Sequence, residues 1–288
     1  MKSRIIIGTS KNVRFAIADT SSIVKNAKKY SDYNEMFLTS EIALLNIASI
    51  LSMNIKSDSG KIALVLKADG MLGNAKALAK YDGRVIANCN LDQNDIIKIN
   101  NVKNIDEFKS LYKIGKGTIL VETNLGLKTP YITGLEINED ETIEEVFEKY
   151  YKNSEQLKTI IKTSIKFNDN NEFDKSGALI IQLLPNSDEN IFDKYEEKMK
   201  MIYNLTELLA HDFTLEKVAD LIFENIEEYN ILETKNLEFA CECNKENFKN
   251  LVLNNLEKKE INEILSEEGY VETVCGFCNR VYRFEDFS

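Results

Sequence analysis

Two closely spaced cysteine pairs near the C-terminus constrain this chain more than any other feature. Four of its five cysteines lie in the last 48 residues, as Cys241 and Cys243 in a C-x-C and Cys275 and Cys278 in a C-x-x-C. Two thiol pairs at the ends of a short segment can close a tetrahedral Cys₄ zinc site. The C-x-C spacing is unusual, because structural zinc sites commonly space their ligands by two to four residues. It also brings two sulfurs near enough to oxidise together, so the pattern indicates both a metal site and a redox switch.

The segment around these cysteines, residues 236–288, is predicted to be a small separate module. Asn244 is a candidate cap for a helix that runs to Leu256, and a second helix over 258–267 is expected to end at Gly269. Residues 270–274 and 280–284 are predicted to form a β-hairpin around the C-x-x-C. A module of this size has little core of its own. Its size therefore independently favours one structural Zn²⁺ per chain.

The remaining bulk properties indicate a soluble globular protein. The chain has 288 residues, of which 43% are hydrophobic and 29% charged. It has no apolar stretch approaching the roughly 18–20 residues that a membrane span needs, and its N-terminus lacks the features of a signal peptide. We therefore expect a cytoplasmic location. In that compartment, clustered cysteines are more often metal ligands or redox thiols than structural disulfides.

Residues 1–185 are predicted to form a mixed α/β domain. Strands are expected at 13–19, 62–68, 75–79, 84–87, 118–122 and 178–184, and helices at 40–52, 139–152 and 154–164. The apolar strand at 178–184 is predicted to be central and to end at Pro185.

Residues 186–235 differ in character and are predicted to form an acidic amphipathic helical linker. They contain neither glycine nor proline, and Thr214 is a candidate helix cap. Apolar residues recur at helical spacing, at Leu215, Val218, Ala219, Ile222 and Ile226. Residues 186–240 carry a net charge of −9 within a total of −11. This negative charge disfavours nucleic acid as a partner. The simplest interpretation of the charged residues is a solvated helix face.

The remaining candidate residues and motifs do not indicate an enzyme. His211 is the only histidine, so acid–base catalysis built on histidine is not expected, and it lies far from the cysteine pairs in the sequence. Cys89 is interpreted as a half-buried structural thiol, and Phe277 as a packing residue between the last two cysteines. The sequence contains no complete phosphate-binding loop, GxSxG or HExxH motif.

Taken together, the motifs resemble those of the redox-regulated 33 kDa chaperonin (heat-shock protein 33) family along nearly the whole chain. The most specific block is the C-x-C and C-x-x-C pair with its flanking residues, 239–244 and 274–279. Weaker blocks lie at 13–20, 70–73, 82–84, 114–118, 154–156 and 176–185. The chain departs from the family pattern at Ser40-Glu41, where a Gly-Arg pair is common, at 30–34, and after Gln156. These departures leave the cysteines untouched.

The resemblance implies an α+β fold with a client-binding core (1–185), a helical linker (186–235) and a redox-switch zinc module (236–288). It implies a holdase that uses no ATP and is silent while reduced and zinc-bound. Oxidation would form disulfides, release zinc and unfold the module and linker, so that a homodimer captures unfolding client proteins. We pair Cys275 with Cys278 and Cys241 with Cys243, and expect the tighter C-x-C disulfide to form more slowly or to be more easily reduced.

Two other functions remain open from the residues alone. One is a zinc-ribbon protein that binds nucleic acid, against which the acidic balance argues. The other is a thiol-disulfide oxidoreductase. A C-x-x-C suits its chemistry, but here it lacks the helix and the βαβ frame of thioredoxin-like proteins.

Overall fold

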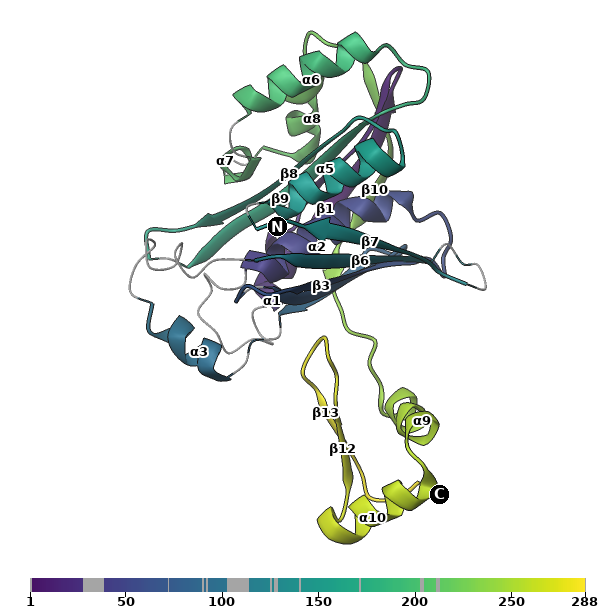
Figure 1. Ribbon diagram of the computed structural model, residues 1–288. Helices are drawn as coiled ribbons and strands as arrows, with labels where there is room; N and C mark the ends of the chain where they lie inside the picture. The colour runs from purple at the N-terminus through teal and green to yellow at the C-terminus, as the bar shows by residue number, and fades with distance from the viewer. Residues whose placement is uncertain are drawn as a thin grey trace. The chain divides into compact units, whose positions relative to one another are not determined.

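The chain divides into two compact units, Met1–Phe239 and Ala240–Ser288, drawn in Figure 1. The computed structural model describes residues 2–27, 39–71, 73–89, 91, 93–102, 114–124, 126, 129–139, 141–170, 172–202, 205–210 and 213–287. His211 lies outside the described residues. The segment 186–235, predicted as a linker, is part of the larger unit in this structure.

A five-stranded antiparallel sheet forms one layer of the larger unit. Its order is β10-β1-β2-β9-β8, with bounds Tyr229–Asn236, Arg4–Ser10, Val13–Asp19, Phe173–Leu183 and Thr159–Phe167. The strand predicted to be central is β9, which pairs with β2 on one side and β8 on the other. Residues alternate between the two faces of such a sheet, so β1, β2, β8 and β9 send side chains into two different cores.

A six-stranded sheet forms the second layer. Its order is β11-β5-β4-β3-β6-β7, with bounds Glu238–Phe239, Arg84–Cys89, Asn74–Lys80, Lys61–Ala68, Gly117–Asn124 and Tyr131–Ile137. The predicted turn at Asp82-Gly83 joins β4 to β5, and Gly83 has a φ of 87°, which glycine adopts without strain. The short α3 (Gln93–Asn100) follows β5.

Helix α2 (Thr39–Leu51) packs against strands of both sheets and forms the centre of the main core (Figure 1). All 13 of its residues are buried, as expected for a segment that is apolar almost throughout. Its polar Asn46 accepts a hydrogen bond from Thr20 Oγ1 at 2.6 Å and donates one to Ser176 Oγ at 3.0 Å. Ser40 and Glu41 are buried in this helix, so that departure from the family pattern lies in the interior.

Three helices cover the opposite face of the five-stranded sheet. They are α6 (Glu189–Met201), α7 (Leu205–Ala210) and α8 (Leu215–Phe223), and they share a second core with β2 and β9. Thr214 caps α8 by accepting from the Lys217 backbone N–H, as predicted. The predicted apolar stripe is confirmed for its four residues on α8, all of which are buried, whereas Ile226 lies beyond the end of the helix and is half-buried. Among the helices that the structure describes, none is long and apolar enough to cross a membrane.

Two secondary-structure predictions are wrong. Residues 154–164 were expected to be helical, but the helix before them, α5 (Ile143–Ser154), ends there and β8 begins at Thr159. The β-branched residues that alternate through Thr159–Ile165 favour a strand. The helical linker also ends early, because β10 fills 229–236 and pairs with β1. Its exposure alternates at every residue, which is the period of an edge strand.

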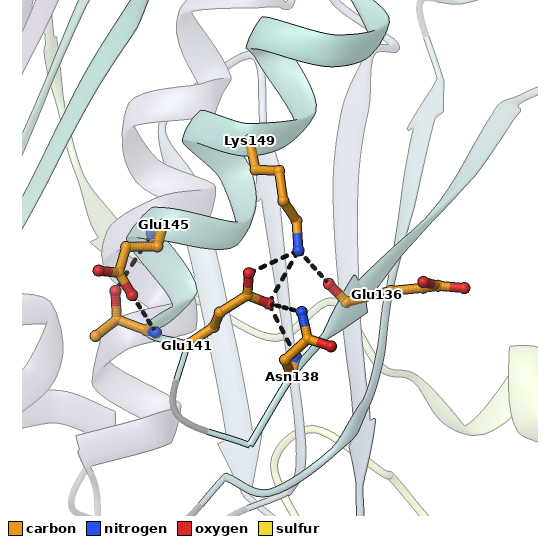
Figure 2. Close-up of polar contacts among 6 residues, drawn as sticks. Glu136, Asn138, Glu141, Glu145 and Lys149 are labelled. Atoms are coloured by element: carbon orange, nitrogen blue, oxygen red, sulfur yellow. Dashed lines mark hydrogen bonds and ion pairs between the residues drawn. The ribbon is translucent and has the colours of Figure 1, made fainter.

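Helix α5 is fixed to the end of β7 by a polar network, which Figure 2 shows. Lys149 Nζ lies 2.8 and 2.9 Å from the two carboxylate oxygens of Glu141 and donates to the Glu136 carbonyl at 3.4 Å. Glu141 also accepts from the backbone and side chain of Asn138. Thr142 and Glu145 form a capping box at the start of the helix. The helix is thereby held in a fixed position beside the sheet.

The smaller unit contains the two helices and the hairpin predicted for it. Helix α9 (Lys245–Asn255) is capped by Asn244, and α10 (Lys258–Glu268) ends at Gly269, whose φ is 79°. Strands β12 (Val271–Val274) and β13 (Val281–Phe284) pair antiparallel. Its core is small: only Val252, Ile261 and Val271 form the buried part of its described apolar cluster.

Docking of α8 on the sheet should contribute strongly to the stability of the larger unit. Leu215→Ala is expected to lower the free energy of unfolding by about 2–5 kcal/mol, because Leu215 is buried against the second core. Leu232→Ala is the matched control, since Leu232 on β10 is 68% exposed and should change that free energy by about 0.5 kcal/mol or less. Urea unfolding followed by circular dichroism measures both; equal losses would contradict the docking.

Candidate metal centre

The four C-terminal cysteines meet at one point of the smaller unit. Cys241 and Cys243 lie in the extended segment before α9, and Cys275 and Cys278 lie in the turn between β12 and β13. All four sulfurs lie within 4.8 Å of one another. The Sγ atoms of Cys241 and Cys275 are 3.6 Å apart, and those of Cys243 and Cys278 are 3.4 Å apart. The structure thus brings together the four residues that the spacing predicted as ligands.

The size of this cluster fits one tetrahedral metal ion. Zinc–sulfur bonds are about 2.3 Å, and a tetrahedron with such bonds separates its sulfurs by about 3.8 Å. The contacts of 3.6 and 3.4 Å fall slightly below that value, and all four sulfurs lie within 4.8 Å of one another. Four thiolates are soft donors, which suit Zn²⁺ and disfavour oxygen-seeking ions such as Mg²⁺ and Ca²⁺.

The hairpin turn positions its own cysteine pair through backbone hydrogen bonds. The Cys275 N–H donates to the Arg280 carbonyl at 2.8 Å, and the Asn279 N–H donates to the Cys275 carbonyl at 2.9 Å. Asn279 has a φ of 54°, a left-handed conformation that asparagine tolerates better than most residues. This tight loop lets the two sulfurs of a C-x-x-C point to the same side.

Backbone N–H groups also stabilise charge on the sulfurs. Burial raises the pKa of the Cys275 thiol, but hydrogen bonds from the Cys278 and Phe277 backbones outweigh it, and the pKa lies below the ordinary value. Burial dominates at Cys241 and Cys278 and raises the pKa of each, although backbone N–H groups of Cys243 and Arg280 oppose it. Without a cation, burial opposes loss of the thiol protons of Cys241 and Cys278; a bound metal would supply the missing positive charge.

Tyr282 supplies a further hydrogen bond that the sequence analysis missed. Its hydroxyl donates to Cys243 Sγ at 3.1 Å, and its ring stacks on Phe248 with centroids 4.9 Å apart. One sequence signal could have pointed to this contact, namely the alternation of side chains along β13. In that strand Tyr282 and Phe284 are buried, while Val281 and Arg283 are exposed. Partners of this kind orient metal ligands and tune them.

Cys89 belongs to the larger unit, at the end of β5, and is not part of the cluster. It is fully buried rather than half-buried, with 1% of its surface exposed. Burial raises the pKa of its thiol to about 11, despite a hydrogen bond from Ser40 Oγ at 3.6 Å. A thiol of this kind is protonated and unreactive near neutral pH, which agrees with a structural role.

Comparison with known proteins gives a consistent result. The family model described as Hsp33 protein matches residues 4–285. The 33 kDa chaperonin of Thermoanaerobacter sp. (strain X514) is 30% identical, over 99% of this chain and 96% of the relative. That of Clostridioides difficile (strain 630) is 26% identical, over 99% and 97%. The fold is similar to the crystal structure of the 33 kDa chaperonin from Thermotoga maritima, with a TM-score of 0.80, 22% identity, and coverage of 99% of this chain and 95% of that one.

The Tyr282 hydroxyl should strengthen metal binding by the cluster. Tyr282→Phe is expected to lower the affinity for Zn²⁺ or Co²⁺ by roughly 10-fold to 100-fold, because Cys243 loses its donor. Tyr270→Phe is the matched control, since that ring packs against Arg283 instead. Competition with a chromophoric chelator under reducing conditions measures both affinities; an unchanged value for Tyr282→Phe would exclude this role.

Proposed function

Because the chain belongs to the Hsp33 protein family, we propose that it is a redox-regulated chaperone that holds unfolding proteins without ATP. The observation that carries the proposal is the meeting of four cysteines within 4.8 Å in a unit with a very small core. The relatives are named chaperonins, a role that involves no enzymatic reaction. Reduced protein would be silent, and oxidised protein would bind clients.

In the reduced state, the thiolates of Cys241, Cys243, Cys275 and Cys278 would hold one Zn²⁺ per chain. Metal binding in small modules contributes roughly 10–16 kcal/mol of folding free energy at neutral pH, and a whole domain is commonly stable by only about 5–15 kcal/mol. Three buried aliphatic side chains cannot replace a contribution of that size. Loss of the metal and unfolding of residues 240–288 would therefore be one event.

Oxidation would convert the cysteine thiolates into disulfides, which are poor ligands for the metal. Formation of each disulfide would remove two electrons from a pair of thiolates, and one hydrogen peroxide would accept them and, with two protons from solvent, become two waters. We propose Cys275–Cys278 and Cys241–Cys243 as the pairs, since residues that adjoin in the sequence stay together once the unit unfolds. In the folded unit, sulfur contacts of 3.6 and 3.4 Å also join one pair to the other.

The acidic segment 186–235 would be the second element of the switch. Helices α6 to α8 cover one face of the five-stranded sheet, where Phe15, Leu179 and Ile181 lie buried beneath them. Repulsion within this acidic segment would favour its release once the smaller unit, which follows it in the sequence, unfolds. Undocking would expose that apolar sheet face, a surface suited to unfolding chains.

We also propose an oligomeric state, a location and a class of partner for this protein. The active form would be a homodimer in the cytoplasm, and its partners would be unfolding proteins rather than nucleic acid or a membrane. The net charge of −9 over residues 186–240 supports this choice, since phosphate binding needs a basic surface.

Activity should appear only with oxidation. The full chain is prepared either reduced with zinc or treated with peroxide at mild heat, and aggregation of a chemically unfolded client is followed by light scattering. We expect suppression of aggregation only by the oxidised sample, in step with release of one zinc per chain to a chromophoric indicator.

Two controls make the experiment decisive. Cys89→Ala should switch as the unchanged chain does, because Cys89 is buried outside the cluster, whereas Cys278→Ser should bind zinc weakly. Zinc release without suppression would contradict the chaperone proposal. Disulfide mapping that found mainly Cys243–Cys275 links would reject the proposed pairing, and catalytic disulfide turnover would favour an oxidoreductase.

A further inference from the structure

A cavity of about 340 Å³ opens in the larger unit, at the end of α2 and beside α5. Its walls come from both sheets and from α5, and include the rings of Tyr131, Phe147, Tyr150 and Tyr151 and the side chains of Ile62 and Val121. Small-molecule sites commonly have volumes of roughly 300–1,000 Å³ and mostly apolar walls with a few placed polar groups. The cavity has that size and character.

Arg14 is the charged group that most distinguishes this cavity. On β2, Phe15 and Ile17 face the layer of helices α6–α8, whereas Ala16 and Ala18 face the core around α2. Arg14 shares the second face by alternation and lines the cavity. A charged side chain thus occupies the inward face of a central strand, a position that normally holds an apolar residue.

The Arg14 guanidinium is held in place but only partly paired. Its Nε donates to Gln182 Oε1 at 2.9 Å, across the β2–β9 pair. Gln182 is fully buried and is fixed in turn by donation to Thr159 Oγ1 at 3.2 Å. No carboxylate of the described residues forms an ion pair with Arg14. Among the described residues, its two terminal amino groups make no hydrogen bond either, so they remain available to a ligand. Burial lowers the pKa of Arg14, but the guanidinium stays charged near neutral pH.

The negatively charged side chain in the cavity wall, that of Glu155, is exposed to solvent. Glu155 follows α5 and is exposed, and its carboxylate accepts a hydrogen bond from the Tyr150 hydroxyl at 2.7 Å. The helix that carries Phe147, Tyr150 and Tyr151 is fixed to β7 by the network of Figure 2. The aromatic wall is consequently preformed, which lowers the cost of binding a rigid ligand.

We propose that this cavity binds a small carboxylic acid with an apolar body about the size of one ring, its carboxylate paired with Arg14 and its body among the aromatic walls. A planar guanidinium with two free amino groups matches a carboxylate in geometry and charge. Neutral apolar molecules would leave Arg14 unpaired in a half-buried site, at a cost in affinity. Binding here needs neither the cysteine cluster nor the redox switch.

The probe for this site is 3-phenylpropionate, titrated against the reduced full chain with ¹⁵N-resolved NMR and saturation-transfer NMR. We expect saturable binding with shifts at the cavity residues. The alcohol 3-phenylpropan-1-ol, which keeps the body and lacks the carboxylate, should bind at least about tenfold more weakly, as a lost charge-assisted hydrogen bond predicts. Equal binding of the alcohol, or no binding of the acid, would overturn the proposal.

Three variants localise the effect. Arg14→Met should weaken binding of the acid about tenfold or more. Arg84→Met, which removes a half-buried arginine paired with Asp82 outside the cavity, should not change it. Glu155→Gln should strengthen binding, since it removes the negative charge and keeps an acceptor for Tyr150. This gain cannot arise from misfolding. A Glu155→Gln variant that binds more weakly than the unchanged chain would count against the site.

Discussion

The meeting of four sulfur atoms is the contact on which the smaller unit depends. Its helices and hairpin are short, and among its described residues the apolar cluster contains three buried side chains. The cysteines instead join the segment before α9 to the turn between β12 and β13, two points that lie 34 residues apart in the sequence. Backbone N–H groups and the Tyr282 hydroxyl direct hydrogen bonds at the sulfurs, so the surroundings are arranged for thiolates.

The larger unit has a different source of stability. Two sheets enclose a helix that is buried along its whole length, and a second core lies under α6–α8. A fold held by two extensive apolar cores has no need of the cysteine cluster. In the proposed switch, the smaller unit would unfold while the sheets of the larger unit persist. Under the same proposal, the acidic helices, which dock through one apolar face, would be the part of the larger unit that is released.

The sequence predicted most of this arrangement where one local signal dominated. Cysteine spacing identified the cluster, and Asn244, Thr214 and Gly269 marked helix ends correctly. Failures occurred where tertiary pairing decided the outcome. β8 and β10 were assigned to helices because a short segment with mixed apolar and charged residues fits either period. The Arg14 cavity and the Tyr282 contact join residues far apart in the chain, which no single-sequence pattern reveals.

The most direct test of the central claim is amide hydrogen exchange in the reduced protein, with zinc bound and after its removal by a chelator in the presence of a reductant. If metal binding by the cysteines holds the smaller unit folded, amides of α9, α10, β12 and β13 lose their protection when zinc leaves. Those of β2 and β9 in the larger unit stay protected and serve as an internal control. Protection in residues 240–287 that survives metal removal would contradict the account.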